Sequence, residues 1–477
     1  MKKMHIIEQI ILITIIIAFI SISIISISLV AGDEFINYFN TYKIYDGETI
    51  YKDVNIISTP LLFYIGMIFF KILGPCLIVF RIYNIFINII VAISIYKIFR
   101  SLKTQKIYSI IYTLVLEILI ANYVVIWGPT YNILGLLLCL IGINFYINKE
   151  KSMCYNVKHG IIIFLIIMSK QNIGIYYSLA YIIIELILNK KEGMKNLLKT
   201  FVITLFSCTL YLMYLYFNGN LVGFIGYTVL GLKEFSQNIF IDALDYIIID
   251  ILIILFIVFV LYKKKYNPED FNSIITVLVF GICLLPIGYP IADRWHMIVA
   301  STVLIICFFY VIHNIIIIEL NVEYKKLNTL IIIIVVFMII SSLYKINLCY
   351  GKVCTDSNSK FYLIPIENET AKDIQLMEEY LLKENKKVII VSPEAGMYKI
   401  NMEFKGDGEF DIPFLGNLGK DGEYGLINEV KKYNNTYFLI HTKKKYWQES
   451  DKLREYIKNN YQIVGNINDF DIYYIKE

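Results

Sequence analysis

The sequence predicts a polytopic α-helical membrane protein, with about eleven transmembrane helices and a small α/β domain at its C-terminal end. Hydrophobic residues make up 57% of its 477 residues and charged residues only 18%, and the mean hydropathy is +0.62. Soluble domains contain fewer apolar and more charged residues. The long apolar runs end near residue 346, so we expect a transmembrane module over 1–349 and a soluble domain over 350–477.

The expected spans are apolar stretches of roughly 16 to 22 residues, enough for a helix to cross about 30 Å of hydrocarbon. The first, Ile10–Ala31, holds no charge and exceeds the roughly 7 to 15 apolar residues of a signal peptide, so we expect an uncleaved anchor. The segment 159–168 is short and is expected to cross as a thin or tilted span. The other spans are expected near 77–96, 107–126, 130–147, 173–188, 200–217, 245–262, 271–289, 297–318 and 328–346.

The basic residues between these spans predict the orientation. Cytoplasmic loops are rich in Lys and Arg, and all the basic clusters fall on one face when the N-terminus is cytoplasmic. The clusters are Lys2/Lys3, Lys97/Arg100/Lys103/Lys106, Lys149/Lys151/Lys158, Lys190/Lys191/Lys195/Lys199, Lys263/Lys264/Lys265 and Lys325/Lys326. The outer face then receives the loop 32–76, the shorter loops 127–130, 169–172, 218–244 and 290–296, and the C-terminal domain.

Two further expectations follow from composition and length. The stretch Pro60–Phe70 is too short to cross and is expected to lie as a helix in the outer interface. If it crossed, every later loop would change sides. Frequent Ile, Lys, Asn and Tyr are typical of a low-GC bacterial genome, so we expect a multi-pass protein of a bacterial plasma membrane.

An acidic pair, Asp33 and Glu34, stands where the first span leaves the membrane. A carboxylate at this position can take a proton from a hydroxyl that reacts at the membrane surface. Acidic residues also favour the first turn of a helix. The alternative is therefore that the pair only begins a helix of the outer loop.

Several features of the N-terminal half together resemble the GT-C glycosyltransferases. They are Asp33-Glu34 past the first span, a tyrosine-rich outer loop with Tyr51-Lys52-Asp53, Pro60-Leu61-Leu62-Phe63-Tyr64 opening an interfacial helix, and Arg81 at the start of the next span. More narrowly, they are similar to the family 39 group, which includes protein O-mannosyltransferases and lipid A aminoarabinose transferases. The number of spans, the outer catalytic loop and the C-terminal domain are also similar.

The resemblance implies transfer of a sugar from a polyprenyl-phosphate carrier to an acceptor on the outer side of the membrane. Asp33 matches the acidic residue held to be catalytic. The sequence departs from the aminoarabinose-transferase pattern where Ser58-Thr59-Pro60 replaces Glu-Lys-Pro. Asp53 is the nearest acidic replacement and is a candidate to orient the acceptor or, with Asp33, to hold Mg²⁺ or Mn²⁺. Its alternative role is that of a solvated loop carboxylate.

The leaving group of this reaction is a phosphate, so cations aimed at its oxygens lower the barrier. The candidates are Lys170, with Gln171 beside it, and Arg294 and His296, all near the outer ends of spans. The alternatives are snorkelling to the interface and, for Arg294, an ion pair with Asp293.

Two residues inside or beside the third span have open roles. Trp127 is a candidate to stack on a sugar, with an interfacial aromatic belt as the alternative. Glu117, a charge within the span, is either functional or paired with a neighbouring helix.

The eight cysteines form no zinc motif. Cys349 and Cys354 lie together on the outer face, either as a disulfide or as two free thiols.

The C-terminal domain is expected to alternate helices and strands. Its Gly416-Asn417-Leu418-Gly419 turn lacks the spacing of a dinucleotide loop, and the chain has no Walker A pattern. The expected helices are 370–386, 423–433 and 448–458, and the expected strands are 388–391, 437–440, 461–464 and 470–475.

The sequence thus predicts a membrane glycosyltransferase with a polyprenyl-phosphate sugar as donor and a protein, lipid or glycan as acceptor. Membrane lipid is the expected environment and no nucleic acid is an expected partner. A transporter or flippase is the first alternative, although such proteins show internal repeats and interrupted helices that the sequence lacks. A polymerase or ligase of lipid-linked glycans is the second.

Overall fold

The computed structural model describes residues 27–29, 32–148, 154–232, 240–263, 267–289, 291–320, 351–402, 406–415, 417–446 and 448–475, with single residues between 14 and 21 and between 333 and 340. The chain divides into two compact units. The first, here the helical unit, comprises Met1–Ser26, Tyr83–Tyr211 and Ile239–Leu348. The second, here the mixed unit, comprises Ile27–Ile82, Leu212–Asn238 and Cys349–Glu477. The single boundary expected near residue 350 stays a prediction.

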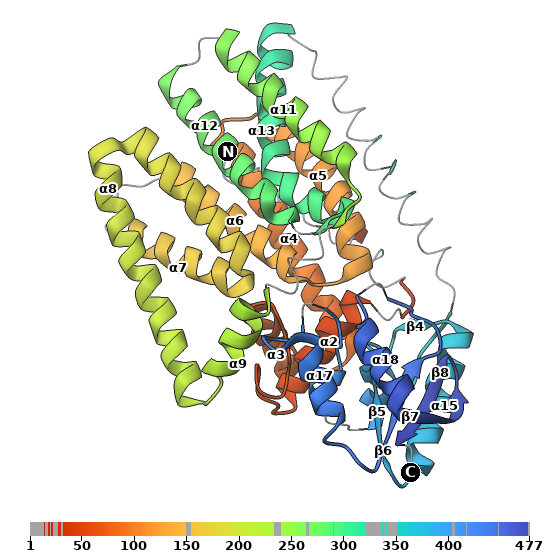
Figure 1. The fold of residues 1–477 in the computed structure, drawn as a ribbon. Coiled ribbons are helices and arrows are strands. Elements are labelled where there is room, and N and C mark those ends of the chain that lie inside the picture. The colour runs from red at the N-terminus through yellow and green to blue at the C-terminus, as the bar shows by residue number, and fades with distance from the viewer. Residues whose placement is uncertain are drawn as a thin grey trace. The chain divides into compact units, whose positions relative to one another are not determined.

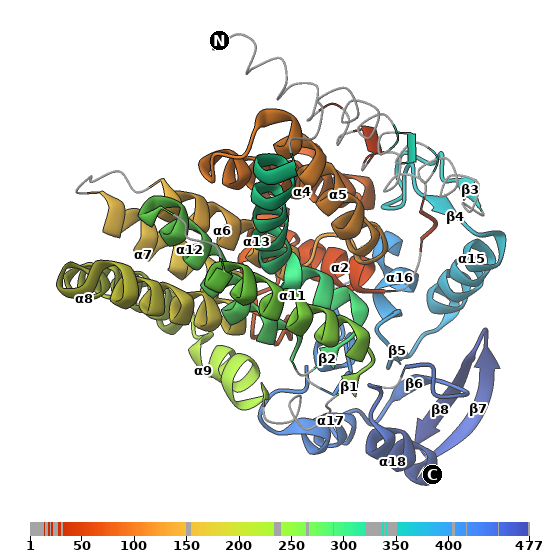
Figure 2. The same ribbon diagram turned by 90° about the horizontal axis from the view of Figure 1, so that it is seen from above.

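Long apolar helices coincide with the predicted spans (Figure 1). Within the helical unit, α13 packs against α5, α11 and α12 (Figure 2). The helices are α4 (Leu77–Ser101), α5 (Lys106–Trp127), α6 (Tyr131–Ile147), α7 (Tyr155–Ser169), α8 (Gln171–Phe217), α11 (Leu244–Lys263), α12 (Pro268–Leu284) and α13 (Arg294–Leu320). A 3₁₀ turn, Leu285–Gly288, follows α12, and two short parallel strands pair, β1 (Phe240–Ile241) with β2 (Ile291–Ala292).

Helix α8 contains both spans expected between residues 173 and 217. Lys190 interrupts it with φ 47° and ψ −119°, within the basic cluster that was expected to join two spans. α7 confirms that the short segment 159–168 is helical. The first expected span, Ile10–Ala31, lies outside the described residues except at 27–29 and a few single positions, and the last, 328–346, lies outside them except at single positions.

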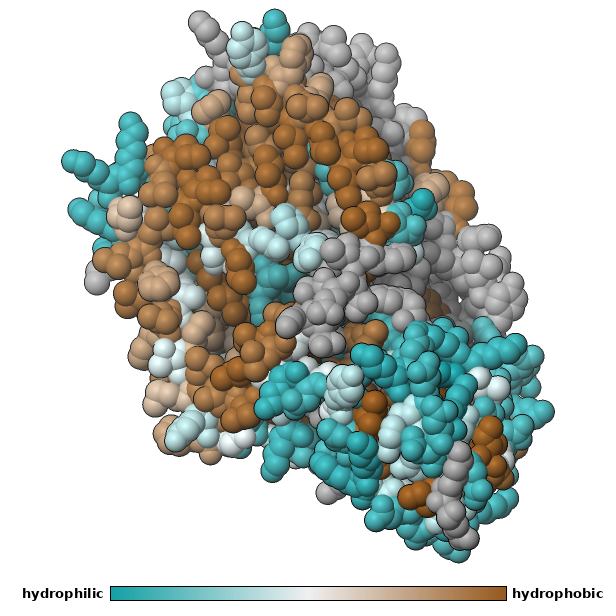
Figure 3. All heavy atoms as spheres, viewed as in Figure 1, coloured by the Kyte–Doolittle hydropathy of each residue, from teal (hydrophilic) through white to brown (hydrophobic). Residues whose placement is uncertain are grey.

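The surfaces of these helices have the composition that lipid requires. Within the described part of the chain, five helices are long and apolar enough to cross a membrane. They include α8 and α11, whose apolar side chains are largely exposed. Hydrophobic residues cover this surface (Figure 3). In a helix the backbone N–H and C=O groups bond to one another, so they need no partner from the hydrocarbon, which has none to offer. The prediction of a polytopic helical membrane protein is confirmed.

The mixed unit begins with two helices joined by the tyrosine-rich loop. Helix α2 (Asp33–Tyr45) packs against α3 (Leu61–Leu73), which confirms the helix expected from Pro60. Ile68 and Ile72 of α3 are exposed, as an interfacial helix requires, and its place in the membrane stays a prediction. The segment 218–244, expected as a loop, instead contains helix α9 (Leu221–Ile225) and a π-turn (Gly226–Leu230).

The C-terminal part of the mixed unit is a four-stranded sheet in the order β5-β6-β8-β7, with β5 and β6 parallel and the other pairs antiparallel. Its core contains Ile389, Phe438 and Leu453, and hydrophilic residues cover its outside (Figure 3). The strands are β5 (Lys387–Ile390), β6 (Thr436–His441), β7 (Tyr461–Ile467) and β8 (Phe470–Ile475). The helices are α15 (Asn368–Lys383), α16 (Ala395–Lys399), α17 (Gly422–Val430) and α18 (Asp451–Asn460), and a small hairpin pairs β3 (Lys352–Val353) with β4 (Pro365–Ile366). The predicted α/β layer is confirmed.

Helix α2 packs against this C-terminal part. Phe35 lies 6.2 Å from Phe361 between ring centroids. A Cβ added to Gly396 would lie 2.5 Å from the Phe39 ring, so only glycine allows this approach of α16. Two backbone hydrogen bonds, Leu29 N to Pro365 O and Leu77 N to Lys360 O, tie the ends of the loop segment to the same region.

A buried ion cluster completes this packing. The Lys43 ammonium donates to Asp411 at 2.6 Å and lies 3.5 Å from Glu48. Its side chain is 1% exposed and that of Asp411 is 2% exposed. Burial lowers the pKa of Lys43, but the two carboxylates raise it more, so the net pKa is raised. The Gly406 N–H donates to Glu48 at 2.7 Å. Each buried charge is therefore paired, as burial demands.

We expect Lys43→Met to lower the free energy of unfolding of the mixed unit by about 3 kcal/mol, because Asp411 would stay buried without its cation. Hydrogen exchange of the α2 and β6 amides in the full chain measures this change. Lys432→Met is the matched control, since Lys432 and its partner Glu429 lie nearer the surface and an exposed pair contributes less than about 1 kcal/mol. Equal effects of the two variants would contradict a structural role for the buried pair.

Candidate functional site

Asp33 and Glu34 form the first turn of α2. The helix begins there because the backbone of Gly32 is extended, with φ −141° and ψ −165°. Glycine has no side chain, so no side-chain oxygen caps the first turn. The free N–H groups of a first helical turn favour negative charge nearby. The acidic pair does begin a helix, and this position is compatible with a role in catalysis, which stays a prediction.

The Glu34 carboxylate is held by Arg81 in a bidentate ion pair. Arg81 Nε donates to Oε1 at 3.0 Å and Nη2 donates to Oε2 at 2.8 Å. Nη1 donates to the Ile27 carbonyl at 2.8 Å. The Arg81 side chain is 1% exposed. Both Glu34 oxygens are therefore occupied by one cation, which suits Glu34 to a positioning role rather than to proton transfer.

Asp33 lies one residue earlier and points about 100° away around the helix. Its side chain is partly exposed, unlike the buried Glu34. The first-turn position favours its negative charge. Of the acidic pair, Asp33 is therefore the residue whose place suits a general base, and this role stays a prediction.

Asp53 closes the tyrosine-rich turn. Its Oδ2 accepts a hydrogen bond from Thr49 N at 2.9 Å, and its carbonyl accepts one from Lys43 Nζ at 3.4 Å. Tyr51 in the same turn has φ 66°, which is unusual for a bulky residue. Among the described residues, no three His, Cys, Asp or Glu side chains gather closely enough to hold a metal ion. The binding of Mg²⁺ or Mn²⁺ by Asp33 and Asp53 stays a prediction.

Lys170 lies at the junction of α7 and α8. Its backbone is extended (φ −157°, ψ 126°), which ends α7, and Gln171 begins α8. The ammonium donates to Asn132 Oδ1 at 2.8 Å and lies 5.0 Å from the Tyr131 ring centroid. The Ser169 hydroxyl donates to the Tyr131 carbonyl at 2.9 Å. These contacts hold the partly buried Lys170 at the start of α6 instead of letting it extend freely to the interface.

The segment before α13 carries a second group of candidates. His296 Nδ1 lies 2.9 Å from Asp293 Oδ1, which also accepts from His296 N at 2.8 Å. Burial raises the pKa of Asp293, but its hydrogen bonds with His296 outweigh this effect and hold the pKa below the usual value. Arg294 is exposed and lies 3.8 Å from Asp245. The Asp293 carboxylate is oriented by His296, so the alternative pairing of Asp293 with Arg294 is not the one observed.

Two further candidates have different outcomes. Glu117 is completely buried in α5, and neither of its oxygens has a hydrogen-bond partner among the described residues. Of its two predicted roles, functional or paired with a neighbouring helix, the described residues show no pairing. Trp127 ends α5, but its side chain lies outside the described residues. Cys349 also lies outside them, so the two alternatives for Cys349 and Cys354, a disulfide or two free thiols, are not tested.

The C-terminal sheet holds a buried polar cluster at the ends of β5 and β6. Ser392 Oγ lies 3.0 Å from His441 Nε2, and Glu394 Oε2 lies 3.7 Å from the same nitrogen. A catalytic triad places the acid on the other ring nitrogen. The Glu394 carboxylate also accepts from Tyr446 at 2.6 Å and pairs with Lys445 at 2.6 Å. This cluster therefore organises the fold and does not activate Ser392.

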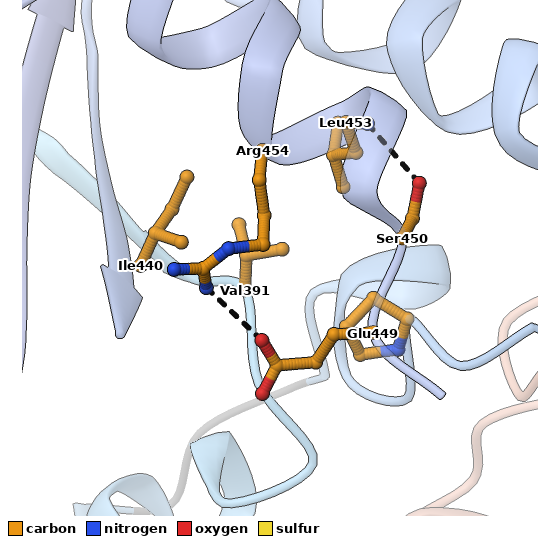
Figure 4. Close-up of a pocket in the computed structure, with 7 residues that line it drawn as sticks. Val391, Ile440, Glu449, Ser450, Leu453 and Arg454 are labelled. Carbon is orange, nitrogen blue, oxygen red and sulfur yellow. Dashed lines mark hydrogen bonds and ion pairs between the residues drawn. The ribbon is translucent and has the colours of Figure 1, made fainter. Parts of the chain in front are cut away.

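A small pocket in the same domain is also occupied by its own side chains (Figure 4). Arg454 Nη1 donates to Glu449 at 3.0 Å and Nη2 donates to the His441 carbonyl at 2.8 Å. Ser450 caps α18 by accepting from Leu453 N at 3.1 Å. Glu449, Ser450 and Arg454 already have hydrogen-bond partners within the protein, so the pocket leaves few polar groups for a ligand. Its lining is Val391, Pro413, Ile440, Glu449, Ser450, Leu453 and Arg454.

Sequence reasoning missed several residues that organise the site. Arg81 was noted only as a feature of the resemblance, although a charged residue opening a span indicates a buried partner. Asn132 gave no signal. Lys43 and Asp411 are separated by 368 positions, and no local pattern relates such residues.

Comparison with known proteins supports the fold. No protein-family model matches the sequence, and no curated protein matches it. Two solved structures of ArnT from Cupriavidus metallidurans match, one bound to undecaprenyl phosphate with a TM-score of 0.59 and one in the apo state with a TM-score of 0.61. In each case the sequence identity is 9%, and the match covers 97% of this chain and 97% of that chain. The chain has the fold of these ArnT structures, which confirms the fold expected from the resemblance.

The buried histidine of the sheet domain predicts a pH dependence of stability. Burial, the largest cause, lowers the pKa of His441; Lys445 and Arg454 lower it further, while Glu394 and Glu449 act against them. The unfolded chain then binds a proton near pH 6.5 that the folded domain binds only at lower pH. The contribution of His441 is complete above about pH 6.5 and is lost as the pH falls, by up to about 1.4 kcal/mol per pH unit.

Hydrogen exchange of the β6 amides between pH 7.5 and 5.5 tests this dependence. His441→Gln should flatten the slope, because the uncharged amide does not titrate. Burial raises the pKa values of Glu48 and Asp407, so these two carboxyl groups make the folded domain more stable as the pH falls. Because both are present in wild type and variant, the difference between the two slopes reports His441 alone. The same slope in both proteins would contradict the assignment.

Proposed function

We propose that this protein transfers a sugar from a polyprenyl-phosphate carrier to a hydroxyl of an acceptor on the outer face of the membrane. One observation carries the proposal: a GT-C fold over 97% of the chain that has Asp33 in the first turn of the helix after the first predicted span. The similar ArnT structure was solved with undecaprenyl phosphate, which supports a lipid of this class as the carrier. The acceptor is a protein, a lipid or a surface glycan.

The proposed reaction divides its tasks among named side chains. Asp33 takes the proton from the acceptor hydroxyl as its oxygen forms a bond to the anomeric carbon. The bond from that carbon to the phosphate oxygen breaks, and the phosphate leaves with the bonding electrons. The Glu34–Arg81 pair holds the first turn of α2 and so positions Asp33. Direct displacement inverts the configuration at the anomeric carbon.

Cations are assigned to the phosphate. Lys170 is preferred because Asn132 and Tyr131 already hold its ammonium in place, which reduces the ordering needed on binding. Arg294 has five donors and a weak exposed contact with Asp245, so it can turn to a phosphate with little loss. His296 and Gln171 are secondary candidates.

Addition of EDTA to the transfer assay tests the dependence on Mg²⁺ or Mn²⁺.

We expect Asp33→Asn to lower sugar transfer by about 10² to 10⁴-fold, because the variant keeps the side-chain shape and loses the general base. The assay follows radiolabelled polyprenyl-phosphate sugars into endogenous acceptors in membranes, with equal protein confirmed by immunoblot. Asp46→Asn is the matched control, since Asp46 is an exposed carboxylate at the other end of α2. Undiminished transfer by Asp33→Asn would remove Asp33 as the base, and absence of transfer in every protein would favour a transport function.

We expect Lys170→Met to weaken binding of undecaprenyl phosphate by about 10- to 100-fold, the effect of losing one charge-assisted hydrogen bond. Binding is measured by the thermal shift of the purified full chain on titration with the lipid. Lys432→Met serves as the control, because this exposed lysine belongs to the C-terminal sheet domain. An equal affinity of Lys170→Met and wild type would exclude Lys170 from the phosphate site.

A further inference from the structure

Asn40 of α2 is a buried amide with neither of its polar atoms hydrogen-bonded within the described residues. It is only 1% exposed. A buried polar group without a partner is destabilising, and native proteins keep few of them. Such a group is retained where a ligand or an ordered water completes its hydrogen bonds.

The position of Asn40 on α2 relates it to Asp33. Seven residues are close to two helical turns, so the two side chains share one face of the helix, about 10 Å apart along its axis. The other faces of α2 are already used. Tyr38 donates to the Pro75 carbonyl at 3.0 Å on the side of Glu34, and Phe39 and Lys43 contact the C-terminal part of the unit.

The distribution of unpartnered groups within the mixed unit is uneven. Asn55 Nδ2 and Ser58 Oγ, in the loop between α2 and α3, are also buried without partners in the described part of the chain. In contrast, the described residues of the C-terminal sheet domain include no buried side chain with an unpartnered nitrogen or oxygen. Asn220 Oδ1, just before α9, is a further buried atom of this unit without a partner in the described residues. The unpartnered groups of this unit therefore lie outside its sheet domain, and Asn40 is the one of them that α2 carries together with Asp33.

We propose that Asn40 binds the sugar of the polyprenyl-phosphate donor through the sugar's hydroxyl or amino groups. This assignment rests on the proposed function and adds the residue that recognises the sugar. A neutral amide both donates and accepts, which complements a hydroxyl. It is a weaker partner for a phosphate than a cation is, because it carries no positive charge and its Oδ1 acceptor cannot pair with a phosphate oxygen. It is also a poor match for the apolar polyprenyl chain. Asn55 and Ser58 are candidates to contact the same sugar.

The first test separates ligand recognition from a structural role. Asn40→Leu keeps the size of the side chain and removes the unpartnered amide, so the melting temperature of the purified full chain without ligand should stay the same or rise. Ser450→Ala is the matched variant at a satisfied buried group, whose hydroxyl caps Leu453 N and donates to Glu423 at 2.7 Å. Its melting temperature should fall. A marked fall for Asn40→Leu would overturn the proposal.

The second test compares two kinds of probe. These are bare undecaprenyl phosphate and undecaprenyl phosphates that carry glucose, galactose, N-acetylglucosamine or 4-amino-4-deoxyarabinose. In wild type and Ser450→Ala, one glycosylated lipid should bind about tenfold more tightly than the bare lipid. In Asn40→Leu the two should bind equally, with the affinity for the bare lipid unchanged. Asn40→Ser, which keeps a small polar group, should show an intermediate difference.

The outcomes distinguish this inference from the proposed function. If Asn40→Leu still prefers the glycosylated lipid, then water or nothing satisfies the amide and the inference is wrong, although the function stands. An effect of the substitution on acceptor affinity alone would also overturn the assignment to the donor sugar. If wild type binds neither kind of lipid, the proposed function fails, and the inference fails with it.

Discussion

The buried ion pair between Arg81 and Glu34 fixes the start of α2, and the arrangement of the candidate site depends on it. A guanidinium that donates two parallel hydrogen bonds to one carboxylate defines an orientation as well as a distance. Neither charge can be removed alone without leaving the other buried and unpaired. The two residues of the acidic pair therefore differ: Arg81 fixes the Glu34 carboxylate, whereas the Asp33 side chain is partly exposed.

Helix α2 uses each of its faces differently. One side packs on α3 and carries Glu34, and a second packs on the C-terminal part of the mixed unit through Phe39 and Lys43. The third carries Asp33 and Asn40. A helix of only 13 residues needs such contacts, because helices of this length are only marginally stable alone. The C-terminal domain thus contributes to the candidate site by packing against the face of α2 that carries Phe39 and Lys43.

The two parts of the mixed unit satisfy their buried polar groups to different degrees. In the sheet domain, Glu394, His441 and Glu449 belong to networks in which every described side chain has a partner. In the loop segment, Asn40 and Ser58 do not. Complete networks rigidify a fold, whereas incomplete ones lower stability and persist where a ligand completes them. This contrast separates the supporting domain from the segment that carries the site.

The sequence alone determined the helical membrane class and the α/β domain, because apolar length and hydrophobic period are local properties of the chain. It also located Asp33 by its position after a span. It could not determine that Arg81 holds Glu34, that Lys43 pairs with Asp411, or that Asn132 holds Lys170. These contacts join residues distant in the chain, and only tertiary packing brings them together.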